Sequence, residues 1–461
     1  MKSITKRAYA CLVLVFAFFF GLGFMFYTFL TEGETWVTHR CNTHIFSKNG
    51  LTVAGTIYDR NGAVLATTED DIRIYNEDES IRKATLHVIG DASGYIATGI
   101  HTVYRANLLG YNIINGIYPV ISGSSESDVT LTLDATVCKA AYEAMDGKKG
   151  TIIVYNYKTG QVVCMVSAPT YDPANKPSDI ATDTDKYEGV YLNRAFSGVF
   201  TPGSTFKTVT AIAAIENIPD IYERSFTCKG KYKTGDGAGD GEVICNGTHG
   251  KLNFERALNV SCNCVFAELA IELGPDIMTQ TVRKLGFAQG VPVGKITTVR
   301  SSFDVSQSTN LDLGWAGIGQ YTTLVNPTQM LLLMGAIANG GTAVNPYLVE
   351  ESSSLSQTKT TASTAINLSP ETAEQIAHML RSNVKNYYGD KKFPNLEMCG
   401  KTGSAEVIGD KSHAWFVGFS QREDFPYAIV VCLQNGGTGY YDAIPVANKT
   451  MQALFSVETQ D

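Results

Sequence analysis

Residues 200–214 read Phe-Thr-Pro-Gly-Ser-Thr-Phe-Lys-Thr-Val-Thr-Ala-Ile-Ala-Ala, and this stretch decides how the chain is interpreted. Pro-Gly predicts a turn, after which an apolar helix is expected to begin at Ser204. Ser204 and Lys207 are three residues apart, so they share one helix face and the amine can reach the hydroxyl. Apolar surroundings lower the pKa of a buried lysine and leave some neutral amine as a base. The helix N-terminus adds partial positive charge where an oxyanion would form.

The Ser-x-x-Lys pattern is weak by itself, because it occurs five times in the chain. Only the copy at Ser204 stands at the start of an apolar helix. The other copies fall in the N-terminal tail, a polar segment, a Ser-rich loop and a helix C-terminus, where solvated sequence explains them. They begin at Ser3, Ser80, Ser356 and Ser382.

A second pattern, Ser-x-Asn, occurs at Ser47, Ser261 and Ser308. Only Ser261-Cys-Asn263 lies in a strongly helical segment. Residues two apart point to opposite sides of a helix, so the chain must turn there if both side chains serve one cleft. The alternative interpretation is a helix cap followed by a buried cysteine.

A third pattern, Lys-Thr-Gly, begins at Lys158, Lys233 and Lys401. The first copy is explained as a hairpin turn and the second as the entrance to a Gly-rich loop. Lys401-Thr-Gly-Ser404 is preceded by apolar residues and followed by an apolar strand, so it is expected at a strand edge that lines a cleft. There Gly403 permits close backbone approach, and the hydroxyls of Thr402 and Ser404 can hold a carboxylate.

The periodicity around these motifs predicts strands at both ends of the second half of the chain, with helices between them. This order favours an α+β domain whose sheet joins distant parts of the chain. The predicted strands are 129–133, 151–155, 162–167, 414–419 and 427–433, with a turn at 156–160. The predicted helices are 135–145, the helix after Gly203, 255–272, 327–339, 370–385 and 443–455.

An uncharged run from Ala8 to Leu30 follows Lys2, Lys6 and Arg7, and it is long enough to cross a membrane as a helix. Basic residues prefer the cytoplasmic flank, so the N-terminus is expected inside and the remainder outside. A cleaved secretory signal is the alternative, but the run exceeds a usual signal core and no small-residue cleavage site follows.

Two further segments complete the organisation. Asp59-Arg-Asn-Gly62 predicts a hairpin turn in a first extracytoplasmic region, which ends at a polar linker over 122–128. A Ser/Thr-rich surface loop is expected at 352–363. The resulting division is a cytoplasmic tail over 1–7, an anchor over 8–30, a small β-rich region over 31–128 and a second domain over 129–461.

Composition excludes one class of partner and limits another kind of site. The formal net charge of -8 argues against nucleic acid, whose binding requires dense Lys and Arg.

The ten cysteines are scattered, so most are expected to be buried thiols. Cys228 and Cys245 bracket the Gly-rich stretch 235–241, where a disulfide would restrain a flexible loop. A metal site is the less favoured alternative, because the spacing lacks a second ligand pair.

Taken together, the three best-placed motifs occur in the order Ser-x-x-Lys, Ser-x-Asn, Lys-Thr-Gly, and the chain resembles a class B penicillin-binding protein. The resemblance covers nearly all of the sequence after the anchor. Phrases typical of the family stand at Gly55–Gly62, Thr132–Asp134, Asn193–Ala195, His249–Gly250, Asn326–Gln329 and Gly400–Gly403.

The resemblance implies a fold and an activity. The fold is a penicillin-binding, β-lactamase-like transpeptidase domain, with helices on both faces of an antiparallel sheet plus an all-helical part. The activity is that of a monofunctional peptidoglycan D,D-transpeptidase without a glycosyltransferase domain, which cross-links stem peptides in cell-wall synthesis and binds β-lactams covalently. It implies no metal or organic cofactor, and it implies glycosyltransferase or other cell-wall synthesis proteins as membrane partners.

The resemblance also assigns roles to residues. Ser204 attacks the penultimate D-alanine carbonyl, Lys207 takes its proton and Ser261 relays a proton to the departing D-alanine. Asn263 bonds the substrate amide and Lys207, whereas Lys401 supplies positive charge. The terminal carboxylate is held by Thr402 and Ser404 beside Gly403, and the backbone amides of Ser204 and Ser404 form the oxyanion hole.

Two departures from the family pattern and three rival functions accompany this interpretation. Ser404 replaces the more usual threonine, and the region from Thr31 to Asp128 is short for the class.

A D,D-carboxypeptidase or β-lactamase would use the same motifs with water as acceptor, and a β-lactam sensor would acylate once. Glu255-Arg-Ala-Leu-Asn259 is reminiscent of a hydrolytic element, but it precedes Ser261 and is interpreted as helix surface. A role in elongation, division or sporulation is not distinguished.

Overall fold

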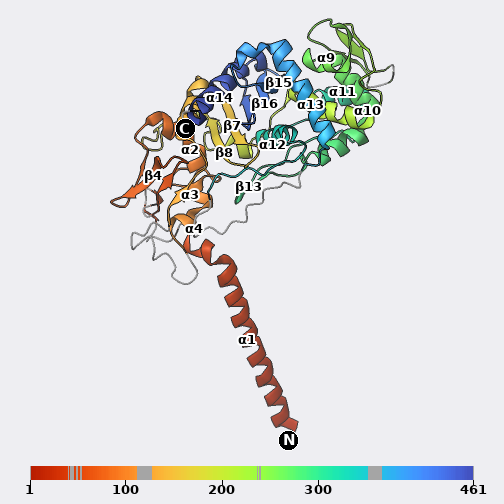
Figure 1. Ribbon diagram of the computed structural model, residues 1–461. Coiled ribbons are helices and arrows are strands. Elements are labelled where there is room, and N and C mark those ends of the chain that lie inside the picture. Colours follow the sequence, from red (N-terminus) through yellow and green to blue (C-terminus); the bar gives the residue numbers. More distant parts are fainter. Residues whose placement is uncertain are drawn as a thin grey trace.

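The computed structural model describes residues 2–39, 41, 46–47, 50–51, 54–111, 127–235, 237, 240–350 and 366–459. Most of the predicted linker over 122–128 and the predicted Ser/Thr-rich loop over 352–363 lie outside these residues. The first element, α1 (Lys2–Val37), projects away from the body of the molecule, with the N-terminus at its far end (Figure 1). Among the described residues, it is the one helix long and apolar enough to cross a membrane.

The body is built on a five-stranded sheet with the order β15-β16-β17-β7-β8. All of its strand pairs are antiparallel, as predicted. Two strands come from early in the domain and three from its end, so the expected joining of distant segments is confirmed. The bounds are β7 Gly150–Asn156, β8 Val162–Ala168, β15 Met398–Ala405, β16 His413–Ser420 and β17 Tyr427–Leu433.

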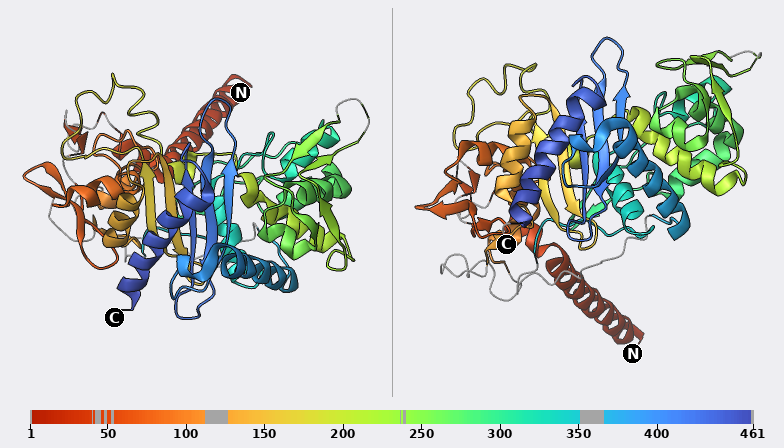
Figure 2. Two further views of the ribbon diagram at one scale, coloured as in Figure 1. Left: turned by 90° about the horizontal axis from the view of Figure 1, so that it is seen from above. Right: turned by 45° about the horizontal axis from the view of Figure 1, so that its top comes forward.

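Helices cover both faces of this sheet, which is why β8, β16 and β17 are buried along their whole length. Helices α6 (Ala135–Ala144) and α14 (Ile444–Glu458) pack against each other and against β8 and β17, and α14 lies across its face of the sheet (Figure 2). Helix α12 (Pro327–Ala338) packs on β7, β16 and β17, and α13 (Pro370–Asn383) packs on α12 and β15.

A mainly helical lobe lies on one side of the sheet, and the region that follows α1 lies on the opposite side (Figure 1). Helix α10 (Asn263–Lys284) packs on α8 (Lys207–Asn217) and α11 (Asn310–Gly317). The single helix predicted over 255–272 is wrong, because α9 (Phe254–Asn259) ends before α10 begins. Ser261 lies between them with a φ of 54°, so the backbone turns at the second motif. Helix α11, which begins with a capping box at Thr309 and Asp312, was not predicted.

The region after the anchor contains a small sheet with the order β5-β4-β3-β6. Asp59 is buried and accepts from the amides of Asn61 and Ala63, which forms the predicted hairpin turn. The strand predicted over 129–133 is shorter than expected, and it pairs in parallel with β3. The bounds are β3 Ile57–Tyr58, β4 Val64–Glu69, β5 Ile72–Tyr75 and β6 Val129–Thr130.

Polar contacts join this region to the transpeptidase-like body. Arg82 of α2 (Glu79–Ile89), a helix that was not predicted, forms a two-pronged ion pair with Asp172. Arg60 in the hairpin turn pairs with Glu458 at the end of α14 at 2.9 Å. Helix α14 therefore ends against the hairpin turn of the four-stranded sheet.

Two buried tyrosines near the end of β7 provide a matched test of this packing. Tyr155 is fully buried beside Gly335 of α12, and its hydroxyl has no hydrogen-bond partner among the described residues. Tyr157 is also buried, but its hydroxyl donates to Ser420 O at 3.1 Å. Removing an unpaired buried hydroxyl is neutral or stabilising, whereas removing a paired one leaves an acceptor unsatisfied.

We therefore expect Tyr155→Phe to leave the free energy of unfolding unchanged or to raise it. Tyr157→Phe is expected to lower it by about 1 kcal/mol. Denaturant unfolding of the full chain in detergent, followed by tryptophan fluorescence, gives both values. A larger loss for Tyr155→Phe than for Tyr157→Phe would contradict the two hydrogen-bond assignments.

Candidate active site

The predicted nucleophile lies on a tight turn rather than on the first residue of an α-helix. A 3-10 turn, η2 (Gly203–Phe206), precedes α8, and residues three apart eclipse one another in such a turn. Gly203 has a φ of 53°, and its amide donates to Gly319 O at 2.9 Å. The turn therefore places Ser204 and Lys207 on the same side of the backbone.

The Lys207 amine is the centre of the site. It is fully buried, and its Nζ lies 3.0 Å from Ser204 Oγ. The same nitrogen lies 2.6 Å from Ser261 O and 2.7 Å from Asn263 Oδ1, with Ser261 Oγ at 3.2 Å. One amine thus joins the first motif to the second.

Burial and a like charge change the protonation of this amine. Desolvation lowers the pKa of Lys207 well below its ordinary value, and the nearby Lys401 ammonium lowers it further. Two of the short contacts are to carbonyl oxygens, which can only accept, so they take two N–H groups of a neutral amine. Its lone pair is then left for Ser204 Oγ.

The second motif occupies the turn between α9 and α10. Its positive φ at Ser261 turns both side chains of the motif toward Lys207, as the chemistry requires. Asn263 is also fixed from behind, because its Nδ2 donates to Ile244 O at 2.8 Å. The alternative interpretation, a simple helix cap, does not fit, because no side-chain cap bond is formed at the start of α10.

The third motif lies on β15, the edge strand of the sheet, and it brings a second buried lysine to the site. Lys401 Nζ lies 2.9 Å from Ser261 Oγ and 3.2 Å from Thr402 O. Burial lowers the pKa of Lys401 to about 7. Lys401 is expected to supply positive charge, and this lowered pKa makes that charge depend on pH near neutrality.

Gly403 allows β15 to approach the nucleophile turn, as predicted. A Cβ added there would lie 2.5 Å from Pro202 O, and one added at Gly203 would lie 3.0 Å from Ser404 O. The backbones of residues 203 and 404 are thus neighbours. Trp415 of β16 reinforces the approach, because its Nε1 donates to Thr201 O at 3.0 Å.

Thr402 and Ser404 alternate with Lys401 and Gly403 along the strand. Ser404 is exposed, and its Oγ accepts from the Gly439 amide at 3.0 Å. Thr402 Oγ1 lies 2.8 Å from the hydroxyl of Tyr388, which Asn383 Nδ2 also contacts at 2.9 Å. Tyr388 and Gly439 were not predicted, because neither belongs to a motif.

The hydrolytic element considered for Glu255 and Asn259 lies elsewhere. Asn259 Nδ2 donates to Ser382 Oγ at 3.1 Å, and Glu255 lines a separate cavity together with His378 and Glu374. Ser382, which begins one of the alternative Ser-x-x-Lys copies, is therefore hydrogen-bonded to Asn259. The first Lys-Thr-Gly copy, at Lys158, forms the hairpin turn between β7 and β8, as predicted.

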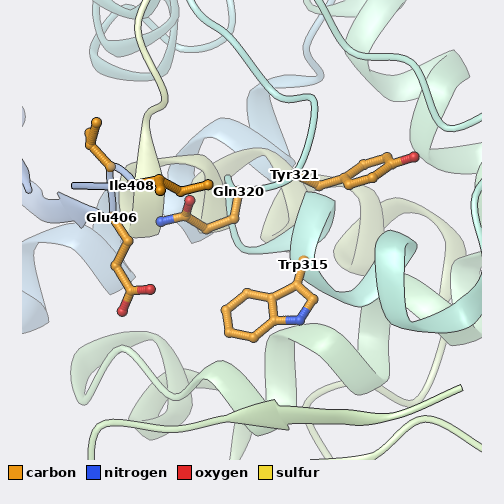
Figure 3. Close-up of a pocket in the computed structure, with 6 residues that line it drawn as sticks. Trp315, Gln320, Tyr321, Glu406 and Ile408 are labelled. Atoms are coloured by element: carbon orange, nitrogen blue, oxygen red, sulfur yellow. The ribbon is translucent and has the colours of Figure 1, made fainter. Parts of the chain in front are cut away.

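An open cavity lies beside the nucleophile turn. It is lined by residues that follow Ala405 on one side and residues flanking Gly319 on the other, and it is shown in Figure 3. Trp315 and Glu406 extend to the same side of the view, whereas Gln320 lies next to the exposed Ile408. The remaining lining residues are Tyr321 and Val407. A peptide bound across Ser204 can place its neighbouring groups here.

The cysteines form no disulfide among the described residues. All ten are free thiols and eight are buried, as expected for most of them, and the disulfide considered for Cys228 and Cys245 is not formed. These two residues instead gather with His249 and Cys262, within 4.8 Å of one another. Such a set could hold a metal ion.

Comparison with known proteins agrees with the fold. Residues 150–455 match the penicillin binding protein transpeptidase domain. The chain is 27% identical over 407 residues to the peptidoglycan D,D-transpeptidase PbpA of Mycolicibacterium smegmatis, covering 78% of this chain and 80% of that protein. It is 28% identical over 334 residues to stage V sporulation protein D of Bacillus subtilis, covering 67% and 50%.

Solved structures show the same architecture. The D,D-transpeptidase domain of a peptidoglycan glycosyltransferase from Eggerthella lenta aligns with a TM-score of 0.72 at 26% identity, covering 89% of this chain and all of that one. The imipenem acyl-enzyme complex of penicillin-binding protein A from M. tuberculosis aligns with a TM-score of 0.74 at 22% identity, covering 87% and 98%. The expected fold class is confirmed. Because the domain match extends from β7 into α14 and spans more than half of the sequence, the chain belongs to the penicillin-binding protein transpeptidase family.

Proposed function

We propose that this chain is a membrane-anchored peptidoglycan D,D-transpeptidase that works through an acyl-enzyme on Ser204. The observation that carries the proposal is the buried Lys207 amine, which contacts Ser204 and both side chains of the second motif. A lysine without an acidic partner, held neutral by burial, is suited to activate a serine hydroxyl.

Acylation begins with the neutral Lys207 amine. Its lone pair takes the Ser204 proton while Oγ bonds to the carbonyl carbon of the penultimate D-alanine. The backbone amides of Ser204 and Ser404 stabilise the oxyanion, and the close approach of residues 203 and 404 supports this pairing. Asn263 then orients both Lys207 and the substrate amide.

Collapse of this intermediate requires a proton on the leaving nitrogen. Ser261 Oγ lies between the two lysines, 3.2 Å from Lys207 Nζ and 2.9 Å from Lys401 Nζ. It can pass a proton to the amide nitrogen as the C–N bond breaks, and the terminal D-alanine leaves as an amine. A second stem's amine then attacks the ester, and the same groups act in reverse.

Recognition of the terminal carboxylate belongs to the third motif. Protonated Lys401 supplies positive charge, and the exposed Ser404 hydroxyl can donate, because its contact with Gly439 uses it as an acceptor. Thr402 contributes through a hydroxyl that Tyr388 orients. β-Lactams, which share the amide and carboxylate, acylate Ser204 and remain attached.

A hydrolase would need a base that activates water after the leaving group has gone. Glu255, the carboxylate considered for that role, lines a different cavity. Transfer to an amine is therefore preferred over a D,D-carboxypeptidase or β-lactamase function.

This function implies a role for each region of the chain. Residues 8–30 anchor the protein with residues 1–7 in the cytoplasm, residues 31–128 form a pedestal and residues 129–461 form the transpeptidase domain. Strand β6 lies in residues 129–461 but pairs with β3 of the pedestal, so one sheet contains strands from both regions. Peptidoglycan glycosyltransferases are the class of membrane partner that would supply the glycan strands.

The first prediction tests the nucleophile and the acceptor. Fluorescent penicillin should label the full-length chain, and Ser204→Ala should abolish labelling. Ser80→Ala, in another Ser-x-x-Lys copy on α2, should label fully. With a pentapeptide stem and a D-amino acid, the wild type should form exchange product in preference to hydrolysed stem. Adduct at Ser80 or predominant hydrolysis would refute the proposal.

The second prediction separates the two lysines by pH. The acylation rate constant should rise with pH as Lys207 loses its proton, and fall as pH passes the Lys401 pKa of about 7. Arginine stays charged, so Lys401→Arg should lose the alkaline limb and keep the acid limb. Lys207→Arg should lower acylation about 10²–10⁴-fold at every pH. An alkaline limb that persists in Lys401→Arg would show that Lys401 is not its source.

The third prediction concerns topology. Protease added to spheroplasts should digest the chain beyond Thr31 and spare the anchor, because the basic flank holds the N-terminus inside. Immunoblots against tags at either end measure this outcome, with a cytoplasmic protein as the control for lysis. A soluble mature form that lacks residues 1–30 would count against the retained anchor.

A further inference from the structure

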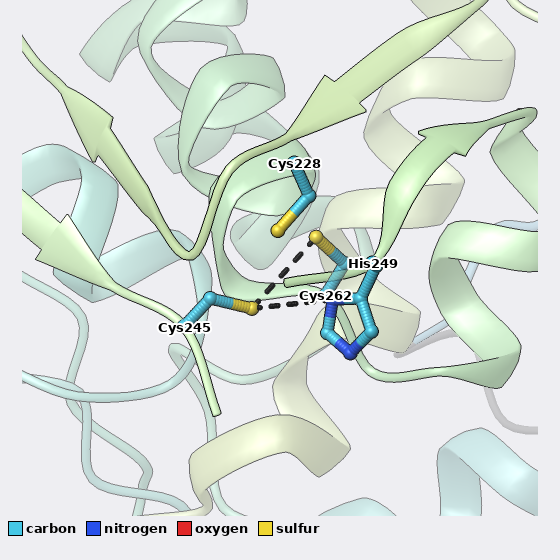
Figure 4. A group of neighbouring side chains, drawn as sticks. All are labelled: Cys228, Cys245, His249 and Cys262. Atoms are coloured by element: carbon cyan, nitrogen blue, oxygen red, sulfur yellow. Dashed lines mark hydrogen bonds between the residues drawn. The ribbon is translucent and has the colours of Figure 1, made fainter. Parts of the chain in front are cut away.

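Three cysteines and a histidine converge directly behind the second motif. We call Cys228, Cys245, His249 and Cys262 the thiol–imidazole cluster (Figure 4). The three cysteines are buried and His249 is half-buried. Their ligand atoms all lie within 4.8 Å of one another, although the residues span three separate segments of the lobe.

Two small ribbons bring these segments together. Strand β9 (Phe226–Cys228) pairs with β12 (Gly250–Leu252), with Cys228 opposite Gly250, so Cys228 lies near His249. Cys245 follows β11 (Glu242–Ile244), and its amide donates to Gly230 O at 2.9 Å. Cys262 comes from the turn that also presents Ser261.

Two distances within the cluster match those of a tetrahedral zinc site before any ion is added. Zinc–sulfur and zinc–nitrogen bonds of about 2.3 and 2.0 Å place tetrahedral ligand sulfurs about 3.8 Å apart and a sulfur and nitrogen about 3.5 Å apart. Cys245 Sγ lies 3.9 Å from Cys262 Sγ and 3.5 Å from His249 Nδ1. The cluster is therefore spaced for a central ion.

A second observation supports a ligand role for Cys245. The Asn263 amide lies 3.2 Å from Cys245 Sγ and donates to it, which stabilises a thiolate. Metal binding needs the deprotonated sulfur, and such outer hydrogen bonds orient metal ligands. Cys264, whose Sγ lies 3.5 Å from Cys228 Sγ, adds a fourth thiol beside the cluster.

We propose that the thiol–imidazole cluster binds one Zn²⁺ ion in a closed Cys₃His site that fixes the second motif. Three thiolates and one imidazole form a structural zinc set, with no position left for water. A disulfide between any two of the cysteines would leave the third thiol and the imidazole without a shared role.

The ion would act on the active site by limiting the movement of the second motif. Asn263 is held to the cluster through its amide on Cys245 and through its side chain on Ile244 O. Ser261 and Asn263 flank the ligand Cys262 on either side, so a fixed Cys262 sulfur limits the movement of both. This positioning role rests on the proposed function, whereas zinc binding does not.

Metal analysis of the full-length chain tests the binding. The protein is purified in detergent through a tag that binds no metal, without chelator, and its zinc is measured by mass spectrometry. About one zinc ion per chain is expected. Cys245→Ala and Cys262→Ala should lose it, and Cys138→Ala, which removes a buried thiol in α6, should keep it.

Two measurements on the wild type make the result independent of whether the variants fold. Cobalt exchanged into the site should give the thiolate charge-transfer and tetrahedral d–d bands. Alkylation in denaturant with chelator but no reductant should modify Cys228, Cys245 and Cys262. A disulfide among them, or substoichiometric metal after incubation with zinc chloride, would overturn the proposal.

The positioning role has its own readout. Chelation should lower the penicillin acylation rate constant, by about 10²-fold for a displacement near 1 Å, and added zinc should restore it. Unchanged acylation after verified zinc loss would refute the positioning role and leave the metal site standing. A zinc-loaded protein that never acylates would instead refute the proposed function.

Discussion

The structure depends on placing two lysine amines in one buried site, where burial disfavours both charges and the charge of Lys401 further disfavours that of Lys207. Lys207 and Lys401 are both fully buried, and Ser261 Oγ lies within hydrogen-bond distance of each. Burying a charge without a counter-ion is costly, and proteins commonly avoid the cost by releasing the proton. The surrounding elements supply carbonyl and hydroxyl acceptors instead of carboxylates. A carboxylate here would hold the lysines protonated and remove the base.

The sequence predicted the parts of this site that local pattern controls. The Pro-Gly turn, the apolar α8 and the hairpin between β7 and β8 follow from short-range rules, and the strands at both ends implied one sheet. A turn at Ser261 was predicted only if Ser261 and Asn263 serve the same cleft, because a regular helix cannot present both side chains on one side. It could not be located as two separate helices, since the positive φ depends on contacts with Lys207 and Ile244.

Long-range packing produced what the sequence did not reveal. Tyr388 contacts Thr402 only because α13 packs on β15, and no spacing in the chain connects them. The cysteines show the same limit. Cys228 and Cys245 suggested a disulfide by their spacing, whereas the fold brings in His249 and Cys262 from the β12 entrance and the turn after α9. His249 is only four residues from Cys245, but Cys262 belongs to another motif, and the fold is needed to bring the four residues together.

The strand order of the central sheet has a consequence for the timing of biogenesis. Strands β7 and β8 leave the ribosome early, but their neighbour β17 and the edge strand β15 are made hundreds of residues later. A chain threaded across the membrane as it is made cannot complete the Lys401 side of the site until most of the domain has crossed. In the proposed topology, the order of synthesis therefore delays assembly of the site around Ser204, Lys207 and Lys401 until most of the domain has been made.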